Sequence, residues 1–467
     1  MQSMLGFDAR DYKKGHKLTR VVWDSRATLN PHMLVLGTSG SGKTTMLRKI
    51  ISDVVGSAHS EGHTSPRFHL FDVHGDLTVP GASSVRLSGQ TEYGINPLVI
   101  DPDPHEGGIR KRVESVISAI NKTSRKLGPR QEAKVRSLLY GLYERKGFFE
   151  DDPGTWTETG TTPKGKPKTF PTMNELSLYI DFLHRRISQL SDERGAFLLG
   201  RINDECARIY RKGKRAAADE LTPNALAKLE ESVEDLKRNF SIRLDKLMNG
   251  DLPEDLEKLH EEDSSGASLE AIRDQLSNFL ASGIFKDHPP DFDPSCSVWR
   301  HDIKSLSDDE QRLFVQFRLE ELFRRISARG MTDAVTDIIV VDEAHLFMDK
   351  DGNNMINRIA KEGRKFGVGL IAASQSPKHF SEDFLSLVAA KIILKTDESF
   401  WDYLNRKMRV PVSSLRWVSA GRRVITQIKS LDSKDSSGDY RLVLLSDGNE
   451  QSPSEQDDAT KKTPSSS

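Results

Sequence analysis

The stretch GTSGSGKT, residues 37–44, combines residue types and a spacing suited to binding a chain of phosphates. It matches the pattern G-x-x-x-x-G-K-[ST], in which glycines let successive backbone N–H groups surround a phosphate. An apolar run, HMLVLG, leads into it, and TMLRKIISDVV follows as a helix-forming run whose N-terminal dipole favours an anion. We predict that Lys43 reaches the β- and γ-phosphates of ATP and that the Thr44 hydroxyl ligates Mg²⁺. The predicted nucleotide-binding residues are Gly37, Thr38, Ser39, Gly40, Ser41, Gly42, Lys43, Thr44 and Thr45.

Two adjacent carboxylates end a second apolar run, IIVVDEAH at residues 338–345. We predict that Asp342 holds the magnesium, directly or through a water, and that Glu343 orients and deprotonates an attacking water. Burying two carboxylates without a cation is costly, so a metal explains the pair. The alternative is that these acids cap the next helix. Beside the phosphate-binding loop, however, they favour an ATP hydrolase with ATP and Mg²⁺ as cofactors.

A third acidic strand end occurs in FDVHGDL, residues 71–77. Asp72 lies at the carboxyl end of a predicted strand, the edge at which ligands bind in such sheets, so we predict a supporting role for it in nucleotide binding. Asp76 is more simply interpreted as a turn residue. His74 could ligate a metal, but no second His or Cys shares its spacing.

Continuous apolar runs separated by helical patterns indicate a parallel sheet buried on both faces. The runs occupy residues 32–37, 68–73, 337–343, 368–374 and 389–396. The predicted fold is therefore α/β, a P-loop NTPase of the RecA-like/ASCE type with a mostly parallel sheet and an all-helical insertion. SVWRHDIKSL is predicted as a further short strand followed by a helix, and RRVITQI and YRLVLLS as a hairpin-like pair.

The expected domain boundaries follow from these runs and from composition. We expect the N-terminal part of the ATPase core at 1–108, the helical insertion at 109–295, the C-terminal part of the core at 296–447 and a disordered tail at 448–467. Within the insertion, an apolar stripe at residues 226–240 predicts a helix or a short coiled coil.

Composition narrows the class of protein. Among 467 residues, no apolar run approaches the roughly 18–20 residues of a membrane helix, and the N-terminus has no apolar signal core. Two distant cysteines, Cys206 and Cys296, form neither a disulfide framework nor a zinc pattern. We therefore expect a cytoplasmic protein without a membrane segment. A net charge of −1 neither indicates nor excludes a nucleic-acid partner, because a local basic channel suffices to bind a phosphate backbone.

Together, PHMLVLGTSGSGKT, FDVHGDL, IIVVDEAHLF and IAKEGRKFGVGLIAASQSP resemble the HerA–FtsK superfamily of ring-forming ATPases, and HerA-type DNA translocases in particular. The resemblance covers mainly residues 30–100 and 297–396. It implies a homo-hexamer with ATP at the subunit interfaces, with Arg364 as a finger entering the neighbour's site and Gln375 as a sensor of the γ-phosphate. A guanidinium binds phosphate oxygens in a fork, which favours Arg364 over Lys365. A solvated helix end and a polar strand cap are the alternatives for Arg364 and Gln375.

The sequence also departs from this family. HerA proteins usually carry an N-terminal β-barrel on which a nuclease partner docks, whereas only about 30 residues precede the first predicted strand here. The helical insertion is more like that of conjugative coupling proteins, whose membrane helices this chain lacks.

The leading hypothesis is a ring-forming ATPase that translocates double-stranded DNA. The alternatives are a HerA-like ATPase that gates or scaffolds an effector such as a nuclease in a defence system, and a soluble coupling ATPase of a DNA-transfer or secretion apparatus. The candidate DNA-contacting segments are basic, and they are residues 109–112, 122–130, 164–168 and 211–215.

Overall fold

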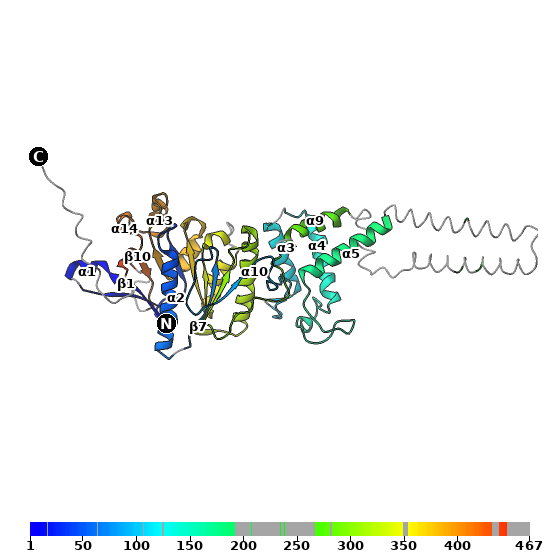
Figure 1. Ribbon diagram of the computed structural model, residues 1–467, viewed down its shortest axis with the longest axis horizontal. Coiled ribbons are helices and arrows are strands. Elements are labelled where there is room, and N and C mark those ends of the chain that lie inside the picture. Colours follow the sequence, from blue (N-terminus) through cyan, green and yellow to red (C-terminus); the bar gives the residue numbers. More distant parts are fainter. Residues whose placement is uncertain are drawn as a thin grey trace, which may run out of the picture. The chain divides into compact units, whose positions relative to one another are not determined.

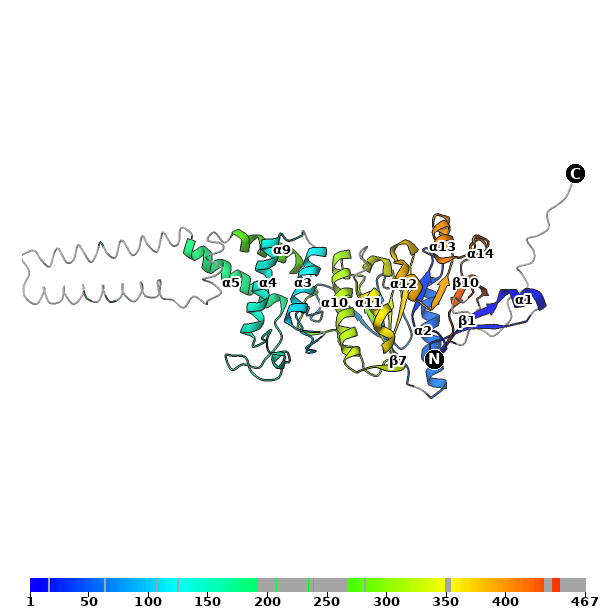
Figure 2. The same ribbon diagram turned by 180° about the vertical axis from the view of Figure 1, so that it is seen from behind.

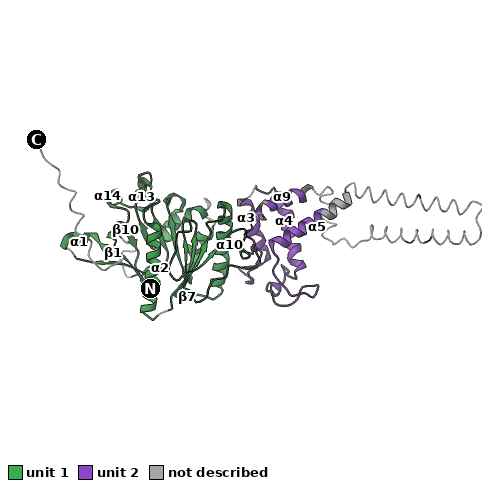
Figure 3. Ribbon diagram, viewed as in Figure 1, with its two compact units in different colours: residues 1–95, 286–467 green, residues 96–285 purple. Residues whose placement is uncertain are grey.

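The chain forms two compact units, one of residues 1–95 and 286–467 and the other of residues 96–285 (Figure 3). The computed structural model describes residues 1–191, 267–348, 354–431 and 439–445, apart from residues 16, 63, 106, 124, 125, 281 and 282, together with residues 207, 234 and 238. Apart from two of these single residues, the predicted apolar stripe at 226–240 lies outside the described residues, as does the predicted tail.

The first unit is built on one sheet (Figure 1). Its eleven described strands lie in the order β2-β1-β11-β10-β9-β3-β8-β7-β4-β6-β5. The strands are β1 Gln2–Asp8, β2 Arg20–Asp24, β3 Met33–Leu36, β4 Arg67–Asp72, β5 Ser83–Arg86, β6 Val298–Asp302, β7 Thr332–Val341, β8 Phe366–Ser374, β9 Ala390–Ile393, β10 Arg423–Ile428 and β11 Arg441–Leu444. The run from β9 to β5 is parallel, and the remaining strands pair antiparallel. The mostly parallel sheet, the strand β6 and the β10–β11 pair are confirmed.

The sequence pattern predicts no strand before residue 32, yet β1 and β2 pair there and extend the sheet beyond β11. The register of the pair shifts between Met4 and Gly6, so the alternation of apolar and polar residues is interrupted. A short strand with a bulge carries too weak a periodic signal to be found from sequence alone.

Helices cover both faces of the sheet. The described α-helices of this unit are α1 Ala9–Gly15, α2 Lys43–Ser60, α10 Asp308–Ser327, α11 Met355–Glu362, α12 Glu382–Leu387, α13 Trp401–Met408 and α14 Val412–Trp417. Helix α2 lies on one face (Figure 1), and α10 and α11 lie on the other (Figure 2). Phe314 of α10 packs near the ring of Phe71, whereas the neighbouring Leu70 belongs to the core under α2. Successive residues of β4 therefore point into different layers, as a buried strand requires.

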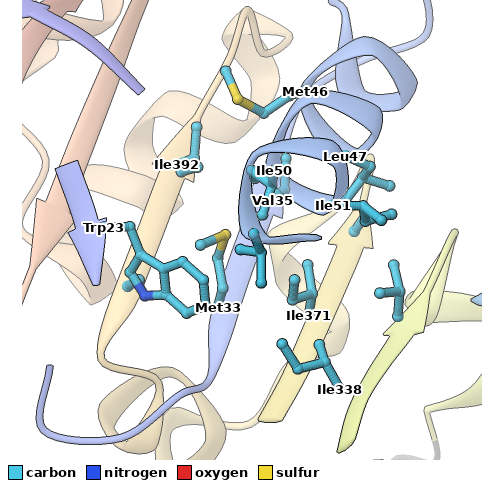
Figure 4. Packing of buried hydrophobic residues seen from close by; sticks show 14 of the residues in the cluster. Trp23, Met33, Val35, Met46, Leu47, Ile50, Ile51, Ile338, Ile371 and Ile392 are labelled. Carbon is cyan, nitrogen blue, oxygen red and sulfur yellow. The ribbon is translucent and has the colours of Figure 1, made fainter. Parts of the chain in front are cut away.

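The core beneath α2 fixes the position of the loop that precedes this helix. Figure 4 shows Met46, Leu47, Ile50 and Ile51 of α2 packed over apolar side chains of the central strands. These side chains are almost fully buried, and burial of an aliphatic side chain contributes about 1.5–3 kcal/mol. The start of α2, at Lys43, is thereby held against the carboxyl end of β3.

The second unit is helical in its described part. Its helices are α3 Ile109–Thr123, α4 Pro129–Arg145, α5 Met173–Ser191 and α9 Ala267–Leu280. Trp156, in the segment that joins α4 to α5, is buried. Its indole nitrogen donates to the carbonyl of Phe149 at 2.7 Å. None of the described helices in either unit is long and apolar enough to cross a bilayer.

Gly367, near the start of β8, allows a close approach of β7. Its φ is +71°, and a Cβ at this position would lie 2.3 Å from the carbonyl oxygen of Ala334. Gly421 has the same φ, but a Cβ there would meet nothing within 4 Å.

We predict that Gly421→Ala lowers the free energy of unfolding by about 1 kcal/mol through backbone strain alone. Gly367→Ala should cost about 1–3 kcal/mol more, because the added methyl group also overpacks the sheet. Urea unfolding of both variants tests this, and equal losses would contradict it.

Candidate active site

The loop between β3 and α2 has the geometry of a phosphate-binding loop. Gly40 and Gly42 have φ values of +72° and +97°, conformations that L-residues other than glycine rarely adopt. Lys43 is the first residue of α2, and its amine donates to the carbonyl oxygens of Gly37 at 3.0 Å and Thr38 at 3.4 Å. The predicted loop residues 37–45 therefore lie together at the carboxyl end of β3, with backbone N–H groups at the start of a helix.

Glu343 is the residue on which the other predicted site residues converge. It lies two residues beyond the end of β7, is 3% exposed and has a left-handed backbone with φ +46°. Its Oε1 lies 3.3 Å from the Lys43 amine and accepts a hydrogen bond from Gln375 Nε2 at 2.8 Å. The structure thus brings Lys43 together with Glu343 and Gln375, although about 300 residues of sequence separate Lys43 from the other two.

The environment of Glu343 keeps its carboxylate ionised. Burial raises its pKa, but hydrogen bonds from His345 and Gln375 and the charge of Lys43 outweigh burial and lower the pKa to about 2. His345 Nδ1 lies 3.2 Å from Oε2, and His74 Nε2 lies 3.8 Å from Oε1. Donors around this buried carboxylate therefore stabilise its charged form.

Asp342 has the opposite electrostatic situation. It is 2% exposed, and burial followed by repulsion from Glu343 raises its pKa to about 6. Carboxylate oxygens of Asp72, Asp76 and Asp342 lie within 4.8 Å of one another, and the Thr44 hydroxyl lies 3.5 Å from Asp76. A cation would relieve the repulsion, and an all-oxygen donor set is the one that Mg²⁺ prefers. The residues predicted to hold Mg²⁺, Thr44 and Asp342, fit that ion, and Asp76 is a donor that the sequence alone left as a turn residue.

Asp72 is fully buried and both of its oxygens are engaged. Oδ1 accepts from the N–H of Gly75 at 2.8 Å, and Oδ2 accepts from the N–H of Leu77 at 2.9 Å. Arg300 of β6 donates to the same Oδ2 from Nε at 2.8 Å and from Nη2 at 2.6 Å. The geometry therefore favours a role in shaping the loop 72–77, which carries His74 and Asp76, over a direct contact with phosphate. Arg300 could not be found from sequence, because only the pairing of β4 with β6 brings it there.

The residues at the two ends of β8 lie far apart, and only those at its carboxyl end lie beside Glu343. Gln375 follows β8 at the carboxyl edge of the parallel strands, beside Glu343. Arg364 and Lys365 precede β8, and both side chains are exposed. A strand rises about 3.3 Å per residue, so roughly 30 Å separates Arg364 from Gln375. The structure therefore does not bring Arg364 to the site of its own chain.

Comparisons with known proteins bear on this arrangement. No family model matches the chain. The DNA double-strand break repair helicase HerA of Saccharolobus solfataricus is 45% identical over 106 residues, 21% of this chain and 21% of the helicase. The helicase of the same name from Sulfurisphaera tokodaii is 51% identical over 65 residues, 13% of each chain. The chain therefore matches only these small shares of the length of its curated relatives.

A solved structure extends the similarity to almost the whole chain. VirB4 of Thermoanaerobacter pseudethanolicus superposes with a TM-score of 0.61, covering 95% of this chain and 96% of that chain at 14% identity. At that identity the likeness shows the fold alone, and the fold and the site together define a P-loop NTPase. The predicted resemblance to the HerA–FtsK superfamily is confirmed by the HerA matches together with this fold.

The carboxylate cluster predicts a metal dependence that can be measured. We expect Asp342→Asn to weaken ATP binding in Mg²⁺ by about tenfold or more, because the variant loses a charged ligand. In EDTA the affinity for ATP should stay at the wild-type value. Calorimetric titration with both buffers checks this, and Asp402→Asn, which alters an exposed acid of α13, is the matched control. Equal loss of affinity in both buffers would contradict the assignment.

Proposed function

We propose that the protein hydrolyses ATP with Mg²⁺ in a ring of six copies that translocates double-stranded DNA. The observation that carries the hydrolytic part is the convergence of Lys43 and Gln375 on the buried carboxylate of Glu343. The partial similarity to proteins named as DNA repair helicases supports the choice of DNA as the load.

The proposed reaction assigns each residue of the site a role. Lys43 and the loop N–H groups bind the phosphates, and Gln375 contacts the γ-phosphate or the attacking water. Glu343 accepts a proton from the attacking water, and the oxygen of that water bonds to the γ-phosphorus. At the same time the bond between the γ-phosphorus and the bridging oxygen breaks, and ADP leaves. Mg²⁺, held by Thr44 and Asp342, would neutralise charge on the phosphate oxygens.

Lys43 also provides a reason why hydrolysis would follow binding. The same amine that contacts Glu343 at 3.3 Å is the one that the proposal gives to phosphate. Sharing it with a nucleotide weakens one of the contacts that lower the pKa of Glu343. The carboxylate then becomes a better base when its substrate is present.

The position of Arg364 supports the proposed ring assembly. An exposed guanidinium about 30 Å from its own Glu343 cannot stabilise charge there, but it can do so in a second copy. A finger supplied by a neighbour contributes several powers of ten to phosphoryl transfer. Lys365 is the weaker candidate, because an ammonium does not fork onto phosphate oxygens.

Contacts with DNA are proposed to be independent of sequence. Among the described basic segments, Lys164 and Lys166 are exposed beside the turn at Gly165, whereas Lys168 is buried against the ring of Phe148. In a ring, one or two lysines per copy produce a girdle of positive charge. Such a girdle binds the phosphate backbone of duplex DNA.

Removing the base should separate binding from turnover. Glu343→Gln is expected to bind ATP with wild-type affinity and to lose turnover by at least about 100-fold, because its amide cannot accept a proton. Fluorescent-nucleotide titration and phosphate release measure the two effects. Glu114→Gln, which changes an exposed ion pair in the second unit, is the control. Wild-type hydrolysis by Glu343→Gln would overturn the assignment.

Duplex DNA should stimulate the ATPase, and the stimulation should fall steeply as salt is raised, because phosphate contacts release counterions. Phosphate release with and without duplex, together with displacement of a triplex-forming strand, measures this. Unchanged rates, with hydrolysis depending on a co-purifying protein, would instead support an effector gate or a coupling ATPase.

A further inference from the structure

His345 lies between the carboxylate of Glu343 and the end of β8. Its Nδ1 is 3.2 Å from Glu343 Oε2 and also 3.2 Å from the hydroxyl of Ser374, the last residue of β8. Lys43 and Gln375 contact the other carboxylate oxygen, Oε1. Different residues therefore contact the two oxygens of Glu343: His345 contacts Oε2, whereas the phosphate-binding lysine contacts Oε1.

The hydrogen bonds of Ser374 indicate which atom carries the proton. Its hydroxyl donates to the carbonyl oxygen of Ser376 at 3.0 Å and accepts from the N–H of Ser376 at 3.2 Å. With its proton used there, Ser374 offers only a lone pair to His345, as Glu343 does. Nδ1 of His345 is therefore the donor. The nitrogen lies 3.2 Å from the Ser374 hydroxyl and 3.2 Å from Glu343 Oε2, a buried oxygen that has no other hydrogen-bond partner.

The ring of His345 is also restrained from its other side. It stacks on His379 with ring centroids 5.5 Å apart and an angle of 25° between the planes. His379 lies in the short helix Pro377–His379, which follows Gln375 by two residues. The segment 374–379 thus contacts Glu343 directly through Gln375 and indirectly through His345.

The backbone of Glu343 explains why such restraint is needed. A left-handed φ at a non-glycine residue is strained by about 1–3 kcal/mol and persists only where surrounding contacts hold it. A carboxylate on that backbone needs partners on both oxygens to keep one orientation.

We propose that His345 is a positioning residue that holds Glu343 in the orientation for hydrolysis and links it to the end of β8. This inference rests on the proposed ATPase function. His345 acts through Glu343, and it does not touch the nucleotide. When the carboxylate rotates to take a proton from water, the Nδ1–H has Ser374 as its second acceptor, so no buried donor is left without a partner.

Substitutions that keep or move the donor test this in the full-length chain. The amide nitrogen of Asn reaches about the position of Nδ1, whereas that of Gln reaches the position of Nε2. We expect His345→Ala to lower kcat by up to about 100-fold with an unchanged dissociation constant for ATP, because the base is misplaced but the phosphate loop is intact. His345→Asn should retain several-fold more activity than His345→Gln. His59→Ala, an exposed histidine of α2, is the control.

A double variant separates positioning from a general structural role. In the Glu343→Gln background, adding His345→Ala should leave the residual rate unchanged, because there is no longer a base to position. A further loss there, or equal activities of the Asn and Gln variants, would overturn the inference. So would wild-type kcat in His345→Ala while Glu343→Gln is inactive. Equal hydrolysis by wild type and Glu343→Gln would instead overturn the proposed function together with this inference.

Discussion

The structure depends on one buried carboxylate that is kept charged. Glu343 lies at the end of β7 with almost no exposure, and its charge is held by Lys43 from the phosphate-binding loop, Gln375 from β8 and His345 from its own segment. An ionised carboxylate in such a place is tolerated because Lys43, Gln375 and His345 stabilise its charge. The parallel sheet and the core beneath α2 bring those elements to the same edge.

In a parallel sheet all strands begin on one side and end on the other, so the two sides differ chemically. Ligands bind at the carboxyl edge, where β3, β4, β7 and β8 end. Arg364 lies at the opposite edge, at the beginning of the same strand that ends beside Gln375. Strand β8 is buried along its length, so it connects the two edges as a stiff element. A ring in which Arg364 enters the next copy would then join neighbouring sites through one strand.

Much of the fold and of the candidate site can be predicted from local sequence patterns. The loop GTSGSGKT, the pair Asp342 and Glu343 and the buried strands are recognisable because their chemistry is set by consecutive residues. Contacts made only by folding were not accessible. The ion pair of Asp72 with Arg300 depends on strand pairing, and it makes an anchor of loop 72–77 out of a residue for which the sequence predicts only a supporting role in nucleotide binding. The role of Asp76 and the contact of His345 with Ser374 likewise depend on loop geometry, and β1 and β2 were missed because a bulge breaks their alternation.

The central claim, that one catalytic centre is completed by two copies, is tested most directly by mixing two inactive variants. Arg364→Ala keeps its base and lacks the finger, whereas Glu343→Gln keeps the finger and lacks the base. Differently tagged copies, refolded or co-expressed together and purified through both tags, should recover ATP hydrolysis well above either parent. Arg364→Ala mixed with the double variant Glu343→Gln/Arg364→Ala should recover none. Failure of the first mixture to hydrolyse ATP, despite recovery of both tags in one assembly, would contradict the account.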